Sequence, residues 1–315
     1  MMPARCFARR GTACAQFCNL SHKRVRETTP LLGLLCFALV ADLAYSQAPA
    51  VVVTGLKTPL FVAVDKGGNL YIADQACIGG FGDCNVYKET LSAGTYAQST
   101  VDTFTAATPP MGVAVDANGD VYIGVFGVGL YRETQSGKSY IRTLVGCADS
   151  AIQGVALDGN GGIYIASSGR VYKETLSSTC YNTMPVAGGA AGASQFDLNV
   201  AADSCGDVYV HQKAIPGFVL KETPSGNGYT QSEVMGSSSI SALAADIKGD
   251  VYVAADNGSL YMALPSTTSY AQTELQSGLT SPGGVAVDSA GNVYVVEESQ
   301  NRIWKVSRQA RSQRV

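Results

Sequence analysis

The chain has 315 residues, of which 46% are hydrophobic and only 15% charged, and it contains 35 glycines and 16 tyrosines. This balance excludes an intrinsically disordered chain, because disorder requires few apolar and many charged residues. Abundant glycine together with β-forming residues predicts instead an all-β protein with many turns.

The N-terminal segment, residues 1–46, differs in composition from the rest of the chain. It contains six of the 22 basic residues and an apolar run, LLGLLCFALV, at 31–40. A basic region followed by a short apolar run and small residues predicts a secretory signal peptide, cleaved after Ser46. A transmembrane anchor is the alternative, but the run is shorter than the ~20 residues that span a bilayer. The long basic leader leaves the true start codon open.

Cleavage would change the charge of the chain. Six basic and two acidic residues lie in the leader, so 16 of 22 and 23 of 25 remain, a net charge of −7. An acidic domain is a poor partner for nucleic acid or for an anionic membrane surface. We therefore expect a secreted or periplasmic protein with no nucleic-acid partner and no membrane insertion after signal cleavage.

Residues 47–315 contain six copies of one pattern, in which Gly follows Asp after three residues and Tyr follows that Gly after three more. The aspartates lie 42 to 51 residues apart, which is the period of a four-stranded propeller blade. The Asp can cap a turn whose Gly tolerates a positive φ, and the Tyr can pack in the core, so we assign both to structure. The copies are VAVDKGGNLYIAD (62–74), VAVDANGDVYIGV (113–125), VALDGNGGIYIAS (155–167), VAADSCGDVYVHQ (200–212), LAADIKGDVYVAA (243–255) and VAVDSAGNVYVVE (285–297).

Two further segments complete each repeat. A Lys-Glu-Thr-like third strand follows each copy, and its charges are expected to form solvated cross-strand pairs. A Tyr-led fourth strand follows in only five repeats, so the last blade lacks its outer strand. We predict that residues 50–56 supply this strand and close the ring, which removes the open sheet edges. The sequence thus predicts an all-β fold, a six-bladed β-propeller of four-stranded blades, as a single domain over 47–315.

The last repeat, from Ser281-Pro282-Gly283-Gly284-Val285 to Lys305, resembles the NHL repeat, and the resemblance recurs six times over residues 50–308. The chain is thereby similar to secreted bacterial NHL proteins and to the sensor propeller of mycobacterial serine/threonine kinases. It is more distantly similar to propeller lactonases, streptogramin lyases and amidating lyases. The resemblance implies that a ligand binds on the face formed by the connections between second and third strands and between blades.

On this face we expect polar and aromatic candidates for ligand binding. His211 is the one histidine outside the leader, and a single imidazole cannot form the multi-histidine site of propeller lyases. It interrupts a row of small residues at the rim, and the alternative is a surface imidazole paired with a neighbour. The six candidates are Asp74, Phe81, Phe126, His211, Asp256 and Glu297.

Lactonase-like propellers hold one divalent cation with oxygen ligands, which carboxylates can supply. The metal candidates are Asp74, Asp256, Glu297 and Glu298, and the alternative is that they are solvated loop carboxylates. We expect no cofactor, with one divalent cation of the Ca or Mg type as the alternative.

Five cysteines lie outside the leader. Cys77 and Cys84 flank a Gly-rich insertion found only in the first repeat, and export favours a disulfide between them. A bridge between Cys180 and Cys205 on the opposite face is a further candidate. Cys147 is then left without an assigned partner.

The expected function is an exported, non-catalytic interaction platform for a protein, peptide, glycan or cell-envelope ligand. Exposed loops on a rigid scaffold commonly carry recognition, so the Phe81 loop and residues 104–111 are the segments expected to contact it. The alternative is a metal-dependent lactonase or hydrolase of the gluconolactonase-like propeller type. A purely structural role in an envelope assembly also stays open.

Overall fold

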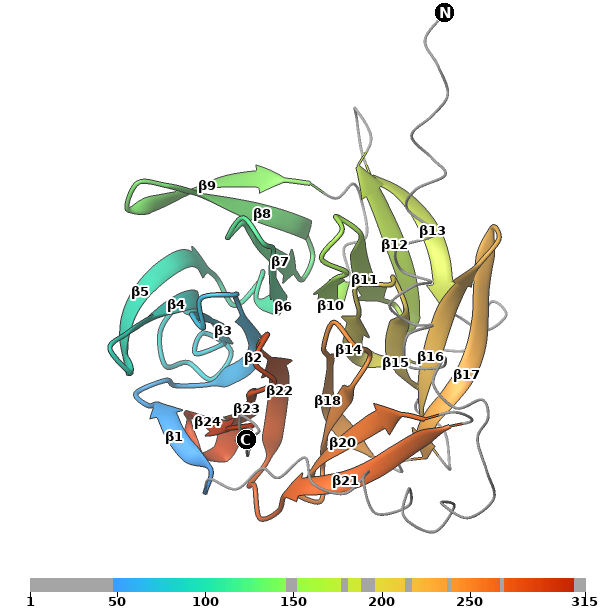
Figure 1. Cartoon of the computed structure of the whole chain (residues 1–315). Helices are drawn as coiled ribbons and strands as arrows, with labels where there is room; N and C mark the ends of the chain where they lie inside the picture. The colour runs from blue at the N-terminus through green and yellow to red at the C-terminus, as the bar shows by residue number, and fades with distance from the viewer. Residues whose placement is uncertain are drawn as a thin grey trace, which may run out of the picture. The chain divides into compact units, whose positions relative to one another are not determined.

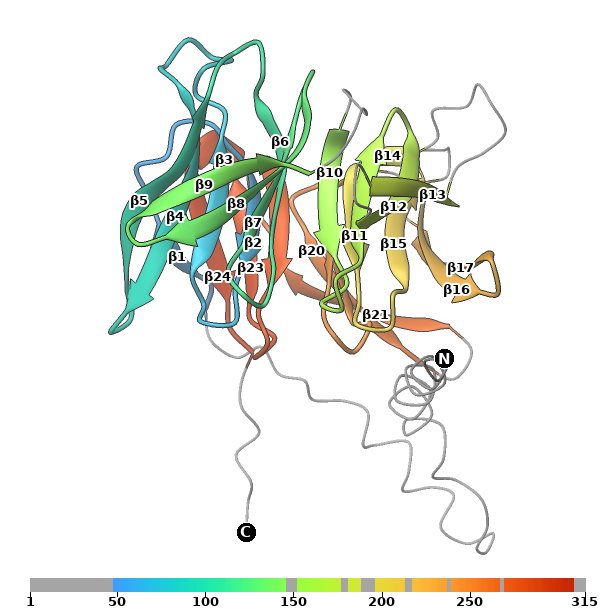
Figure 2. The same cartoon turned by 90° about the horizontal axis from the view of Figure 1, so that it is seen from above.

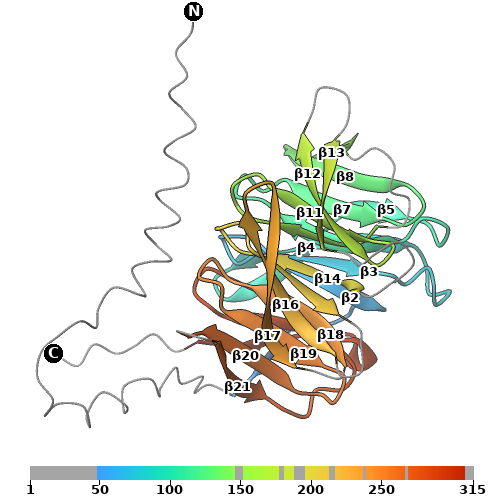
Figure 3. The same ribbon diagram turned by 90° about the vertical axis from the view of Figure 1, so that its right-hand side faces the viewer.

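The computed structural model describes residues 48–145, 152–176, 181–187, 196–212, 217–236, 239–266 and 269–308. These residues form six four-stranded antiparallel sheets, arranged as blades around one axis (Figure 1). This confirms the predicted all-β six-bladed propeller, which Figures 2 and 3 show from its sides. The predicted signal peptide lies outside the described residues. Within the described ranges, no helix has the length and apolar character needed to cross a membrane.

The blades share one strand order, counted outward from the axis. The first strands are β2 (Pro59–Val64), β6 (Pro110–Val115), β10 (Ile152–Leu157), β14 (Phe196–Ala202), β18 (Ile240–Ala245) and β22 (Pro282–Val287). The second strands are β3 (Leu70–Asp74), β7 (Val121–Val125), β11 (Ile163–Ser167), β15 (Val208–Gln212), β19 (Val251–Ala255) and β23 (Val293–Glu297). The third strands are β4 (Cys84–Ser92), β8 (Gly129–Ser136), β12 (Arg170–Leu176), β16 (Phe218–Ser225), β20 (Leu260–Pro265) and β24 (Arg302–Val306). The fourth strands are β5 (Thr95–Phe104), β9 (Ser139–Leu144), β13 (Tyr181–Ala187), β17 (Gly228–Gly236), β21 (Tyr270–Gln276) and β1 (Ala50–Val53).

The N-terminal strand closes the ring, as predicted. β1 pairs antiparallel with β24, with Ala50 opposite Lys305 and Val51 opposite Trp304. The order β22-β23-β24-β1 makes it the outer strand of blade 6, and Figure 1 shows the blue β1 beside the red β24. The strand ends at Val53 rather than at residue 56. Closure therefore joins the two ends of the propeller by hydrogen bonds within one sheet.

The repeated aspartates organise the turns between first and second strands. Asp65 Oδ1 accepts hydrogen bonds from the backbone N–H groups of Gly67 (2.8 Å) and Asn69 (2.9 Å). Gly68 takes a φ of 79°, a conformation that Gly adopts without steric cost. The Tyr71 hydroxyl lies 3.4 Å from the other carboxylate oxygen, and its side chain is fully buried. Both residue types thus have the structural roles that the repeat pattern predicted.

Small residues in the first strands allow the blades to meet near the axis. A β-carbon at Gly112 would lie 3.1 Å from Gly154 Cα, and one at Gly284 would lie 2.7 Å from the Leu60 carbonyl oxygen. Any side chain at Gly284 would therefore push two neighbouring first strands apart.

The glutamates of the Lys-Glu-Thr segments are buried, whereas the sequence predicted that they form solvated charge pairs. Their side chains are 1% to 4% exposed, because neighbouring blades pack over this side of the third strands. Glu222 accepts a hydrogen bond from Gln231 Nε2 (2.7 Å). The lysines cover tyrosine rings, as where Lys173 Nζ lies 5.0 Å from the Tyr164 ring centre. The four glutamates are Glu89, Glu133, Glu174 and Glu222.

Candidate ligand-binding face

Antiparallel blades place two kinds of connection on one face of the ring, here called the loop face. These connections join second strands to third strands and each fourth strand to the next blade. The Asp-x-x-Gly turns lie on the other face, here called the turn face, because consecutive strands in a blade alternate in direction. Cys205 belongs to one of these turns. Its candidate partner Cys180 and the remaining Cys147 lie outside the described residues.

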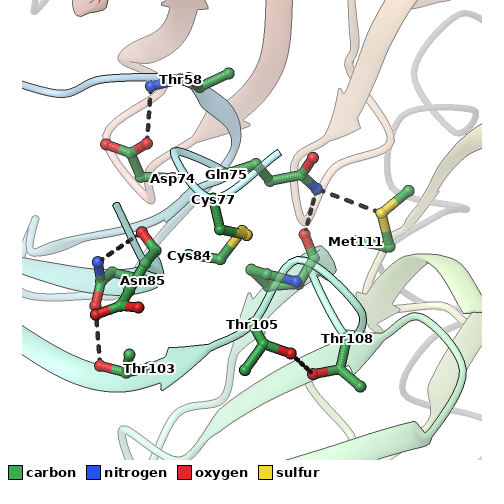
Figure 4. Close-up of a disulfide and its surroundings, with 12 residues drawn as sticks. Thr58, Asp74, Gln75, Cys77, Cys84, Asn85, Thr103, Thr105, Thr108 and Met111 are labelled. Atoms are coloured by element: carbon green, nitrogen blue, oxygen red, sulfur yellow. Dashed lines mark hydrogen bonds between the residues drawn. A yellow bond between two sulfur atoms is a disulfide. The ribbon is translucent and has the colours of Figure 1, made fainter. Parts of the chain in front are cut away.

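Among the loop-face connections that the structure describes, the longest is the segment 75–83, which joins β3 to β4. A disulfide between Cys77 and Cys84 spans it, with the Cα atoms 4.8 Å apart (Figure 4). Lys57 Nζ donates a hydrogen bond to the Phe81 carbonyl oxygen (2.7 Å), and Gln75 Nε2 donates to that of Pro110 (2.6 Å). The segment is therefore fixed at both ends and against the next blade.

Three exposed apolar side chains lie on loop-face connections of the adjacent blades 1 and 2, and we call them the apolar patch. Phe81 is 64% exposed and Ile78 is 58% exposed, both on the segment held by the disulfide. Phe126, 48% exposed, lies in the β7–β8 turn, where its N–H donates to the Pro109 carbonyl oxygen (3.0 Å). The connection 105–109 thus lies against this turn, and Figure 4 shows Thr105 and Thr108 near the disulfide.

Two of the predicted ligand-binding carboxylates, Asp74 and Glu297, bind the scaffold. Both are 2% exposed, at the ends of β3 and β23. The oxygens of Asp74 accept from the backbone N–H groups of Lys57 and Thr58, each at 2.8 Å. Each carboxylate therefore anchors the connection that enters its own blade.

Glu297 is the more heavily bonded of the two. One oxygen accepts from the backbone N–H (2.8 Å) and the hydroxyl (2.7 Å) of Thr280. The other accepts from Arg302 Nε (2.5 Å) and Trp304 Nε1 (2.6 Å). Burial alone would raise the pKa of Glu297, but the hydrogen bonds from Trp304, Thr280 and Arg302 outweigh it and lower the pKa to about 2.

The other two carboxylates, Asp256 and Glu298, come from blades 5 and 6, and we call them the acidic pair. Asp256 is exposed and accepts hydrogen bonds from the hydroxyls of Ser239 and Ser241 (2.6 Å for the latter). Glu298, the first residue of the 3-10 helix η2 (Glu298–Gln300), lies over Gly283, where a β-carbon would be 2.6 Å from its Oε1. Burial, followed by the negative charge of Asp256, raises the pKa of Glu298.

The acidic pair contacts residues that closely precede the cavity-lining parts of two first strands. Ser241 lies two residues before Leu243 of β18, and Gly283 lies one residue before Gly284 of β22. All six first strands line a cavity of about 180 Å³, mostly with Ala, Gly and Val. Asn199 adds an amide to this lining and donates to the Ser241 carbonyl oxygen (2.5 Å).

His211 differs from its predicted place at the rim. It is 1% exposed and lies within β15, paired with Val219 of β16. Its side chain is therefore buried, and the residue is not the exposed rim residue or surface imidazole that the sequence predicted. Within the described ranges, no group of three or more His, Cys, Asp or Glu side chains is arranged to hold a metal ion.

Comparison with known proteins supports the fold. No family model matches the chain, and no curated protein matches it. Similar solved structures include a carbohydrate-active enzyme of Trichoderma reesei (12% identity, TM-score 0.61, 83% of this chain and 96% of that one). A gluconolactonase of Xanthomonas campestris has 12% identity and a TM-score of 0.59, over 82% and 88% of the two chains. The virginiamycin B lyase of Staphylococcus aureus has 12% identity and a TM-score of 0.55, over 82% and 97%. At such identities the likeness concerns the fold alone, and the NHL resemblance stays a prediction.

Sequence reasoning missed three residues of this face: Lys57, Gln75 and Ile78. Lys57 and Gln75 act through contacts with distant loops, which no local pattern reveals. Ile78 could have been found, because it lies directly before the Gly-rich part of an insertion between two cysteines.

Proposed function

We propose that the propeller is an exported, non-catalytic binding platform whose ligand contacts the apolar patch on the loop face. The observation that carries this proposal is the exposure of Ile78, Phe81 and Phe126 on adjacent blades. Large apolar side chains that gather on one sector of a surface mark interaction sites, whereas single exposed ones are ordinary. The opposite face offers Ile247 as its one large exposed apolar side chain among the described residues.

The fixed geometry of the segment 75–83 supports the same proposal. The Cys77–Cys84 disulfide and the hydrogen bond from Lys57 hold the backbone that carries Phe81. A loop held in place before binding loses little conformational entropy when its ligand arrives. Rigid support under exposed aromatic residues is therefore expected of a recognition loop rather than of a passive connection.

A polypeptide is the ligand class that this chemistry favours over a glycan. Ile78, Phe81 and Phe126 offer apolar area without hydrogen-bonding groups, and polypeptides present apolar side chains that can be buried against them. The one tryptophan, Trp304, donates a hydrogen bond to Glu297 within blade 6 and is therefore not part of the apolar patch.

The alternative, a cation-dependent hydrolase, draws less support from the four carboxylates. Asp74 and Glu297 already accept hydrogen bonds from the scaffold. Asp256 and Glu298 remain, and two carboxylates provide fewer oxygens than the about six to eight that Ca²⁺ takes. Export, secreted or periplasmic, is part of the proposal and is consistent with the disulfide.

To test the proposal, a random peptide display library is panned on the immobilised chain 47–315. The affinity of each recovered peptide for the chain is then measured by fluorescence anisotropy. We expect Phe81→Ser and Ile78→Ser each to weaken binding by roughly tenfold, as for residues at the centre of an interface. Ile247→Ser is the matched control, because Ile247 is 66% exposed on the turn face. Loss of binding in this control, or a library that yields no peptide above background while polysaccharides bind, overturns the proposal.

A further inference from the structure

Resting on the proposed function, we propose that the peptide segment that binds the apolar patch carries an Asp or Glu side chain, which forms an ion pair with the Lys57 ammonium. The occupant is thus a segment of a partner protein in which one acidic residue is flanked by large apolar residues. Its apolar residues cover Ile78 and Phe81, and the ion pair fixes the position of the segment on the loop face.

The Lys57 ammonium has a defined position beside the apolar patch. Lys57 lies in the connection that enters blade 1, and its side chain is exposed. Its Nζ donates a hydrogen bond to the Phe81 carbonyl oxygen at 2.7 Å, and a β-carbon at Gly82 would lie 3.5 Å from the same Nζ. Phe81 supplies both this carbonyl group and an exposed ring of the patch. A ligand that covers the ring therefore passes close to the ammonium.

The positive charge of Lys57 has no counter-ion within the part of the chain that the structure describes. None of the ion pairs there includes its Nζ. The carboxylate of Asp74 accepts from the backbone N–H of Lys57 (2.8 Å), whereas the cation of Arg302 is paired with Glu297 (2.5 Å). An ammonium has three N–H groups, and the Phe81 carbonyl oxygen accepts from one of them. Two donors and an uncompensated charge thus remain for a ligand.

The backbone around Lys57 favours a side-chain carboxylate over a C-terminal one. Capture of a chain terminus uses several backbone N–H groups that converge on the carboxylate. Here the N–H groups of Ile78, Gly80 and Phe81 donate to carbonyl oxygens within the segment 75–83, at 3.0, 3.3 and 2.9 Å. The ammonium of Lys57 offers instead a single point charge, which suits the carboxylate of one Asp or Glu side chain.

The net charge of the domain limits how acidic the ligand can be. Residues 47–315 carry 16 basic and 23 acidic residues. Such an excess of negative charge disfavours the approach of a strongly anionic partner. The bound segment should therefore carry one acidic residue among apolar ones rather than a run of acidic residues.

The first test pans the random peptide library on the chain 47–315 and, separately, on its variant Lys57→Met. Met keeps an unbranched apolar side chain and removes the charge. We expect Asp and Glu to be enriched over the starting library, next to large apolar residues, in the peptides recovered on the wild type but not in those recovered on Lys57→Met. Lys66→Met is the matched control, because Lys66 is exposed in the Asp-x-x-Gly turn of blade 1, and it should recover the wild-type set.

A second test separates the charge of Lys57 from its support of the segment 75–83. The tightest acidic peptide and a form with the corresponding amide at its acidic position are measured by anisotropy. On the wild type we expect the acidic form to bind about fivefold more tightly, as for a favourable ion pair at a partly exposed site. This preference should vanish in Lys57→Met, and Lys57→Glu should prefer a form with Lys at that position. Loosening of the segment alone would weaken both forms equally.

The outcomes distinguish this inference from the proposed function. Peptides that depend on Phe81 but show no enrichment of Asp or Glu, or bind the wild type equally as acid and amide, overturn the inference and leave the proposed function standing. The acid–amide comparison on the wild type needs no variant, so it holds even if Lys57→Met does not fold, which melting curves by circular dichroism reveal. A preference for a free C-terminal carboxylate over a C-terminal amide, without one for the acidic side chain, also overturns the inference.

Discussion

The hydrogen bonds of Glu297 allow a quantitative prediction for the variant Glu297→Gln. The carboxylate accepts from Thr280, Arg302 and Trp304 and is 2% exposed. Its pKa falls from the ordinary 4.5 to about 2. Since each pKa unit corresponds to about 1.4 kcal/mol, the folded state gains about 3 kcal/mol at neutral pH from this ionised group. The amide of the variant would also turn its NH₂ toward donors, so we expect a comparable loss of unfolding free energy.

The pH dependence gives the sign of this effect. A pKa that is lower in the folded state contributes stability above the unfolded pKa of about 4.5, and the contribution is lost as the pH falls toward about 2. The difference in unfolding free energy between wild type and Glu297→Gln should therefore be largest near pH 7. It should be less than half as large near pH 3, by the same linkage.

Urea unfolding at several pH values tests the prediction. Trp304 is the only tryptophan and bonds directly to Glu297, so its fluorescence reports on blade 6 and circular dichroism reports on the whole fold. Glu233→Gln, at an exposed position of β17, is the control for the same chemical change. An equal loss in both variants, or a difference that does not change with pH, would refute the reasoning.

Three other variants have distinct expected effects on stability. Burial raises the pKa of Glu222, so its ionisation opposes folding as the pH rises, and Glu222→Gln should raise the melting temperature at pH 8 more than at pH 5. Replacing Cys77 and Cys84 by Ser should cost roughly 2 kcal/mol from loop closure and make the segment 75–83 a site of limited proteolysis, detected by mass spectrometry. The Ser167 hydroxyl is fully buried with no hydrogen-bond partner among the described residues, so Ser167→Ala should leave the melting temperature equal or higher.

The fold could be predicted because each repeat contains its own turn chemistry. Asp65 and Gly68 form a turn that depends on residues within four positions, and the same local arrangement recurs in every blade. The closing strand was also predictable, since only five outer strands follow the six repeats and one blade is left without its fourth strand. Its exact end at Val53 was not, because strand length depends on the register with β24.

The burial of charged side chains could not be predicted from the same pattern. Glu222 has the sequence surroundings of a solvated surface residue, with Lys221 before it and Thr223 after it. Its burial results from a neighbouring blade, which lies about a repeat away in the chain. His211 shows the same limit, since its exposure depends on how β16 and the adjacent blade cover β15.

The adjacent residues Glu297 and Glu298 show why the site was harder to predict than the fold. Glu297 is the last residue of β23, so the strand directs its side chain into the blade, toward Trp304. Glu298 begins the connection, where the chain leaves the sheet and η2 directs the carboxylate over Gly283. Two identical side chains thus have opposite pKa shifts. Hydrogen bonds from Trp304, Thr280 and Arg302 outweigh burial and lower the pKa of Glu297, whereas burial and the charge of Asp256 raise the pKa of Glu298.

The same division between strand end and connection extends around the ring. Residues three positions after the repeated tyrosine end the second strands and are buried in five blades, at Asp74, Val125, Ser167, Ala255 and Glu297. Residues one position later begin the connections, and there Phe126, Asp256 and Glu298 differ in size and charge. Changes at the earlier position affect blade packing, whereas changes at Phe126 or Asp256, which are exposed at the later position, alter the loop face with little effect on the core. The loop face can therefore diverge at the later position while the propeller is retained, so that six equivalent repeats can form the asymmetric face on which we propose that a ligand binds.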